Sequence, residues 1–243
     1  MNGVDRAGSR WRPDARALTA EFVGTAFLLA GVVGSGIMAE RLTDDVGLQL
    51  LQNAFATAGV LVALILALGP ASGAHFNPAV TLADRIFGGV DTPTAVYYVI
   101  AQTAGGVLGV IVANAMFGLD LVEWSTKDRS AGHLAFAEGV ATLGLLLVIF
   151  GVVRSGRGSA AAYAVGGYIG GAYYFTSSTS FANPAVTVAR MFSDTFAGIS
   201  PASVPLFIVA QFLAVAVAVV VIRAIYPHIG QVAEQVILPH RSE

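Results

Sequence analysis

Long apolar stretches alternate with short polar segments along most of this chain. Six stretches approach the length of a transmembrane helix, which needs about 20 apolar residues to cross the hydrocarbon core of a bilayer. They are residues 17–39, 47–69, 93–117, 133–153, 159–177 and 202–226. The fifth is rich in Gly and Ala, which let membrane helices approach closely, so it is predicted to pack inside the bundle. The pattern predicts an all-α membrane protein.

The same landmarks occur twice, in the same order, in the two halves of the chain. The first and fourth stretches contain "AEFVGT" with Glu21 and "AEGVAT" with Glu138, and the third and sixth contain Gln102 and Gln211. One Asn-Pro-Ala motif follows the second stretch and another follows the fifth. Because each half has an odd number of spans, the second half must be inverted relative to the first.

This inverted repeat suggests four segments along the chain. They are an N-terminal tail at 1–16, a first repeat at 17–120, a second repeat at 121–226 and a C-terminal tail at 227–243. With the N-terminus in the cytoplasm, nine basic residues fall inside and four fall outside. The outer four are Arg41, Lys127, Arg129 and Arg190. We therefore expect a multi-pass protein of the cell membrane with both tails in the cytoplasm.

Each Asn-Pro-Ala motif is followed by an apolar segment that is too short to span. About ten helical residues rise roughly 15 Å, which is half of a bilayer. Pro78 and Pro184 suit the first position of a helix, and Asn77 and Asn183 suit the N-cap before it. The motifs therefore predict two re-entrant half-helices that enter from opposite faces and meet near the midplane.

Two helix N-termini that meet at the midplane create a site for neutral solutes. Each N-terminus places about half a positive charge there, which repels cations and disfavours a proton wire. The Asn amides are left to donate hydrogen bonds to a passing solute. The predicted pore constriction consists of Asn77, Pro78, Ala79, Asn183, Pro184 and Ala185.

Composition mainly argues against certain classes of partner and cofactor. Hydrophobic residues make up 56% of the chain and charged residues 12%, and the net charge is −2. This charge gives no reason to expect nucleic acid as a partner. The chain has no cysteine and its four histidines show no metal-ligand spacing, so neither a metal nor another cofactor is expected. The expected partners are the lipid bilayer and a small neutral permeant.

With these motifs, the chain resembles the aquaporin or major intrinsic protein family over nearly its whole length after residue 16. The matching segments are "AEFVGT", "SGAHFNPAVT" at 72–81, the paired Gln residues and the second Asn-Pro-Ala. The resemblance implies six tilted helices plus two half-helices, a pore in each protomer and a homotetramer. It also implies passive movement of water or small neutral solutes, and it gives Glu21 and Glu138 the role of holding the re-entrant loops.

The resemblance also locates a second constriction, the selectivity filter, by counting from the two Asn residues. The filter position that is normally Arg is Val186 here, and the other positions are Thr57, Gly171 and Ser180. Phe55 competes with Thr57 for its position. These small, uncharged residues imply a wide ring that passes glycerol-sized solutes. The second motif resembles a divergent bacterial branch associated with metalloid acids such as arsenite.

Several residues near the motifs leave more than one interpretation open. His75 either lines the cytoplasmic pore mouth or gates it by protonation. Glu21 and Glu138 either hold the loops or relay protons. The charged residues that follow the motifs are most simply solvated or paired within loops; they are Asp84, Arg85 and Arg190. Two glycines of the third span, at 105 and 109, are expected at helix contacts.

Two other classes of function compete with a passive channel. An ion- or proton-coupled secondary transporter also uses inverted repeats and broken helices, but it needs charged or carbonyl-rich coupling sites at the midplane. Asn at both helix starts supplies neither charge nor titration. An intramembrane enzyme would need paired metal ligands, a Ser/His pair or a carboxylate dyad, and the sequence shows no such arrangement.

Overall fold

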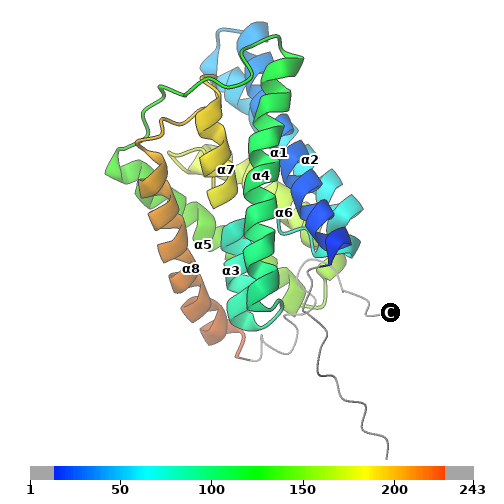
Figure 1. The fold of residues 1–243 in the computed structure, drawn as a ribbon. Helices are drawn as coiled ribbons and strands as arrows, with labels where there is room; N and C mark the ends of the chain where they lie inside the picture. The colour runs from blue at the N-terminus through cyan, green and yellow to red at the C-terminus, as the bar shows by residue number, and fades with distance from the viewer. Residues whose placement is uncertain (1–13, 228–243) are drawn as a thin grey trace, which may run out of the picture.

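The computed structural model describes residues 14–227, which form a bundle of eight α-helices (Figure 1). The long helices are α1 (Ala15–Leu42), α2 (Val46–Ser72), α4 (Thr92–Met116), α5 (Gly132–Arg154), α6 (Ala161–Phe175) and α8 (Val204–Ile225). The short helices are α3 (Pro78–Phe87) and α7 (Pro184–Ala189), each of which begins at the Pro of an Asn-Pro-Ala motif. Most of the predicted tails, 1–16 and 227–243, lie outside the described residues.

Five of the described helices are long and apolar enough to cross a membrane: α1, α2, α4, α5 and α8. The predicted fifth span, 159–177, is shorter in the structure. A 3₁₀ turn occupies Gly158–Ala160, and the extended backbone of the second re-entrant loop begins at Thr176. This leaves 15 residues in α6, or roughly 22 Å of helix.

The two halves of the chain pack in corresponding ways. In the first half α1 contacts α2 and α4, and in the second half α5 contacts α6 and α8. The halves meet where α2 packs against α6 and where α3 contacts α7. Figure 1 shows α7 and α3 near opposite ends of the bundle. The half-helices therefore enter from opposite sides, as the repeat predicts.

Two glycines on α4 bring its backbone against α1. A Cβ atom on Gly105 would lie 2.2 Å from the carbonyl oxygen of Phe22, and one on Gly109 would lie 2.1 Å from that of Ala26. Both distances are far below van der Waals contact, so no other residue fits without moving the backbone. The close crossing of α1 and α4 thus depends on these glycines, which are one helical turn apart.

Candidate functional site

The two half-helices begin with the N-caps that the motifs predict. The Asn77 side-chain oxygen accepts a hydrogen bond from Ala79 N at 2.9 Å, and the Asn183 oxygen accepts from Ala185 N at 3.0 Å. Pro occupies the first helical position in both. These caps hold the Asn side chains at the ends of the half-helices, where the partial positive charge of each helix is concentrated.

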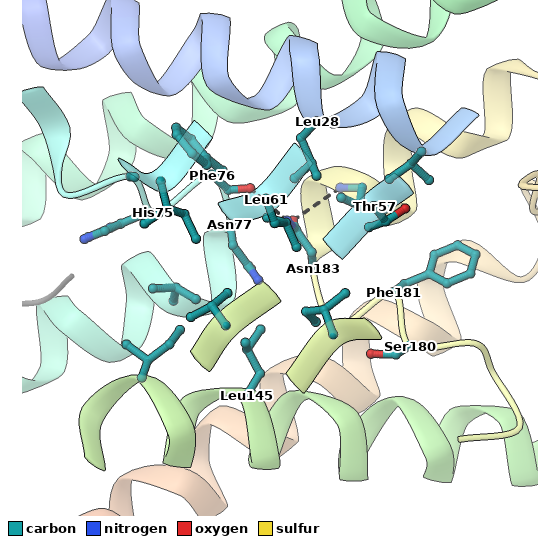
Figure 2. Close-up of a pocket in the computed structure, with 18 of the residues that line it drawn as sticks. Leu28, Thr57, Leu61, His75, Phe76, Asn77, Leu145, Ser180, Phe181 and Asn183 are labelled. Atoms are coloured by element: carbon teal, nitrogen blue, oxygen red, sulfur yellow. Dashed lines mark hydrogen bonds between the residues drawn. The ribbon is translucent and has the colours of Figure 1, made fainter. Parts of the chain in front are cut away.

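Each Asn amide also fastens the loop of the opposite half. Asn77 Nδ2 donates to the carbonyl of Ala182 at 2.8 Å. Asn183 Nδ2 donates to the carbonyl of Phe76 at 2.8 Å, and Figure 2 shows these two residues side by side. An amide NH₂ carries two hydrogens, so one hydrogen per Asn remains for another acceptor. The motifs therefore join the two half-helices and still leave donors at their junction.

Both re-entrant loops contain residues in the left-handed region of backbone conformation. They are Ala74 and Phe76 before the first motif, and Thr179, Ser180 and Ala182 before the second. For residues other than glycine this conformation costs about 1–2 kcal/mol each. Such loops persist only where surrounding contacts hold them.

Glu21 supplies those contacts for the first loop. Its carboxylate accepts hydrogen bonds from the backbone N–H groups of His75 and Phe76, at 2.9 and 2.7 Å. It also accepts from Ser72 Oγ at 2.6 Å and Gln102 Nε2 at 2.7 Å. These four donors saturate the buried carboxylate.

Glu138 repeats this arrangement in the second loop. It accepts from the N–H groups of Phe181 and Ala182, both at 2.8 Å, and from Gln211 Nε2 at 2.7 Å. Gln211 also donates to Thr187 Oγ1 at 3.0 Å, which ties the loop to α7. Neither Glu21 nor Glu138 is among the residues that line the cavity between the halves. The geometry therefore favours loop support over a proton relay.

A narrow cavity of about 60 Å³ lies between the two halves. Eight of its 20 lining residues are aliphatic side chains from α1, α2, α5 and α6. Figure 2 shows His75 toward one end, the two Asn residues in the middle and Ser180 toward the other end. The polar and charged side chains on the wall are Thr57, His75, Asn77, Tyr173, Ser180, Asn183 and Arg190.

Three of the four predicted filter residues line this cavity: Thr57, Ser180 and Val186. Thr57 is 3% exposed, whereas its competitor Phe55 is 80% exposed and points away from the core. Ser180 is buried, and its hydroxyl oxygen has no hydrogen-bond partner within the described part of the chain. That hydroxyl therefore keeps an unused donor and acceptor beside the cavity.

The fourth predicted filter residue, Gly171, does not line the cavity. It is exposed, and no neighbouring atom lies within 4 Å of where its Cβ would be. Tyr173 lines the wall instead, and its hydroxyl lies 3.1 Å from Thr57 Oγ1. Counting from Asn183 implied a ring of small side chains only. The structure instead places the large side chain of Tyr173 on the wall.

The phase of α6 explains this correction. Val165, Ile169 and Tyr173 recur every four residues and face the cavity along one side of the helix. Gly171 is two residues from Tyr173, which is about 200° around a helix of 3.6 residues per turn. Counting back from a motif across a loop requires an assumed loop length. The four-residue spacing of the lining residues along α6 requires no such assumption.

Two charged residues that were expected to be solvated or paired in loops are buried. Asp84 is 2% exposed, and its Oδ2 lies 3.6 Å from Nε2 of His75. Arg190 is 2% exposed and lines the cavity. The sequence did hold a signal for Arg190, because it follows Val186 by four residues and a continuing helix places such residues on one face.

His75 lies on the cavity wall, as expected for a residue near one mouth of a pore. Its Nδ1 is 3.1 Å from Thr81 Oγ1, and its ring meets the ring of Tyr98 edge-on with centroids 5.4 Å apart. These contacts and the nearby carboxylate of Asp84 fix the orientation of the imidazole.

Comparison with known proteins agrees with this geometry. The sequence model of the family described as Major intrinsic protein matches residues 9–176. The chain belongs to the major intrinsic protein family. It is 46% identical over 208 residues to aquaglyceroporin AqpS of Rhizobium meliloti (strain 1021), an alignment that covers 86% of this chain and 89% of the relative.

More distant members of the family show the same likeness. The lens fiber major intrinsic protein of Ovis aries is 34% identical over 182 residues, which cover 70% of this chain and 66% of that protein. The X-ray structure of the aquaglyceroporin from Plasmodium falciparum superposes with a TM-score of 0.71 at 20% identity. It covers 89% of this chain and 98% of that one, and it shows the shared fold.

Membership in the major intrinsic protein family makes this chain a membrane channel for water and small solutes. The comparisons give no support to the coupled-transporter alternative, and Figure 2 places His75 away from the junction of the two Asn residues. That junction carries the neutral amides of Asn77 and Asn183.

Proposed function

We propose that the protein is a passive channel for water and for neutral polyhydroxy solutes of about the size of glycerol, including undissociated metalloid acids such as arsenite. The observation that supports this most directly is that Val186 and Ser180 both line the cavity. Val186 offers no hydrogen bond, whereas the Ser180 hydroxyl is buried and unpartnered among the described residues.

The wall combines an apolar surface with a short series of polar groups. A polyol can leave water at low cost only if its hydroxyls find new hydrogen bonds, because an unpaired polar group in an apolar site costs roughly 1–3 kcal/mol. The free amide hydrogens of Asn77 and Asn183 can donate to its oxygens, and the Ser180 hydroxyl can donate or accept. Its carbon side meets the aliphatic wall. Solutes with several hydroxyls fit this pattern better than ions.

The finer assignments belong to the same proposal. The relative of 46% identity is named an aquaglyceroporin, which supports a solute larger than water. Glu21 and Glu138 are proposed as loop supports, and the filter is proposed as Thr57, Tyr173, Ser180 and Val186. We also propose a homotetramer in the cell membrane, with both tails cytoplasmic and with the two repeats divided near residue 120.

Stopped-flow light scattering on purified proteoliposomes tests the solute class. Vesicles are challenged in parallel with gradients of water, glycerol, urea and arsenite, and empty vesicles serve as the control. We expect flux of water, glycerol and arsenite above that of empty vesicles, always down the gradient. Flux of water alone would overturn the solute proposal. Flux that follows an imposed sodium or proton gradient would favour the coupled transporter.

A further inference from the structure

Arg190 is a buried cation that makes no ion pair within the described residues, although the Glu138 carboxylate lies near enough to interact with it electrostatically. Its Nε donates to the carbonyl of Ala197, and its guanidinium carbon lies 3.5 Å from the centroid of the Phe181 ring. A backbone carbonyl and a ring face offset part of the desolvation, but they leave the net charge in place.

The two terminal nitrogens of Arg190 have no hydrogen-bond acceptor among the described residues. Guanidinium carries five N–H donors, and four of them are on these terminal nitrogens. Only the Nε donor has a hydrogen-bond acceptor among the described residues. The side chain lines the cavity, so the remaining donors are available to whatever occupies it.

Helical geometry places Arg190 one turn beyond Val186. The backbone N–H of Arg190 donates to the carbonyl of Val186, so the helical turn that begins in α7 continues to this residue. Four residues rise about 6 Å, in the direction away from Asn183. Charge therefore enters the cavity wall one turn beyond Val186.

We propose that Arg190 is the charge-selecting residue of the outer pore: it excludes cations, including hydrated protons, and donates hydrogen bonds to the oxygens of passing neutral solutes. An unpaired positive charge beside a narrow path of low dielectric repels cations much more strongly than it would in water. The second function rests on the solute class proposed above, whereas cation exclusion does not. Size selection at Val186 and charge selection at Arg190 then belong to different residues.

Arg129 provides a matched control for this proposal. It is a partly buried arginine, and its guanidinium carbon lies 5.0 Å from the centroid of the same Phe181 ring. It donates to the carbonyls of Gly198 and Ser178, at 3.0 and 3.3 Å, and it does not line the cavity. Replacing it removes one positive charge near the same place without changing the cavity wall.

The test compares Arg190→Gln, Arg190→Lys and Arg129→Gln with wild type in proteoliposomes. Sodium leak is followed with radioactive sodium, proton leak with an entrapped pH dye, and glycerol flux by light scattering. We expect wild type, Arg190→Lys and Arg129→Gln to remain tight to cations. Arg190→Gln should raise cation leak on the order of tenfold while it still passes glycerol.

The outcomes separate this inference from the proposed function. A folded Arg190→Gln protein with the cation leak of wild type and of Arg129→Gln would overturn the role of Arg190. If the Gln variant does not fold, a folded Arg190→Lys protein that leaks cations would overturn it, as would a leaky wild type. Absence of glycerol flux in wild type, together with a leaky Arg190→Gln, would refute the solute class and leave cation exclusion standing.

Discussion

At the scale of single residues, the two motif asparagines do two things at once. Each side-chain oxygen caps its own half-helix, and each amide donates to a carbonyl of the opposite loop at 2.8 Å. One amide hydrogen per residue remains for the permeant. The same side chains therefore hold the junction of the halves, where the positive ends of the two half-helices form an electrostatic barrier to cations.

Replacing Asn77 or Asn183 with Asp should lower that barrier. A carboxylate opposes the positive potential of the helix end, so we expect cation leak in proteoliposomes to rise on the order of tenfold. Asn53→Asp is a suitable control, because Asn53 is buried and hydrogen-bonded but does not line the cavity. Unchanged leak and unchanged solute flux in both motif variants would mean that the pore lies elsewhere.

Val186→Arg should reduce glycerol flux more than water flux. The longer side chain narrows the wall where Ser180 and Tyr173 also lie, and water is small enough to pass a narrowed ring. Light scattering of both solutes on the same vesicles gives the ratio directly. The variant places a second buried positive charge one turn from Arg190, so detergent-stable folding is verified first by size-exclusion chromatography. A well-folded variant with an unchanged ratio of glycerol to water flux would contradict the role given to Val186.

At the scale of elements, a glycine is required only where the backbones of two helices come into contact. Helix α4 crosses α1 closely because glycines at 105 and 109 leave room for carbonyl oxygens of α1. Helix α6 is also glycine-rich, but at two of its glycines, Gly167 and Gly171, an added Cβ would meet no atom within 4 Å. The same residue type is thus required at one place and tolerated at another.

Gly109→Val should destabilise the protein, whereas Gly171→Val should not. The first forces side-chain atoms into the backbone of α1, and overpacking of this kind costs about 1–3 kcal/mol or more. The second adds a side chain in open space and should change stability by less than about 0.5 kcal/mol. Thermal unfolding in detergent compares the two. A change in glycerol selectivity for folded Gly171→Val would show that this residue does face the pore.

At the scale of the whole molecule, one chain contains a complete cavity between its two inverted halves. The described residues on its wall come from both repeats of this one chain. Large apolar side chains such as Phe55, Phe136 and Val220 are exposed on the outside of the bundle, where lipid or further protomers can cover them. We therefore expect conduction not to depend on assembly.

We predict a homotetramer of four independent pores. Native mass measurement in mild detergent should give four times the 25.0 kDa mass of the chain. When a fraction of protomers carries a blocking substitution, the glycerol flux per unblocked protomer should stay the same. The reason is that the wall of each pore is formed by a single chain. Conducting monomers alone would remove the tetramer and leave the pore intact.

The features that follow from local geometry and from the repeat can be derived from the amino-acid sequence alone. Asn followed by Pro favours a capped helix start. Two such starts in halves with an odd number of spans require insertion from opposite faces. The apolar segments after them were too short to span, and α3 and α7 are half-helices for that reason. The Glu and Gln landmarks of each half also meet as a pair, at 2.7 Å in both.

Which side chains face the cavity near its outer end depends on how distant segments pack, and it became known only from the tertiary structure. Tyr173 lies there in place of Gly171 because the rotation of α6 about its axis, set by packing against α2 and α5, determines which residues point inward. Arg190 is buried because the helical turn after α7 continues and directs it along the face of Val186. Helix rotation and the length of a loop depend on contacts between distant segments, and a motif a few residues long carries no information about them.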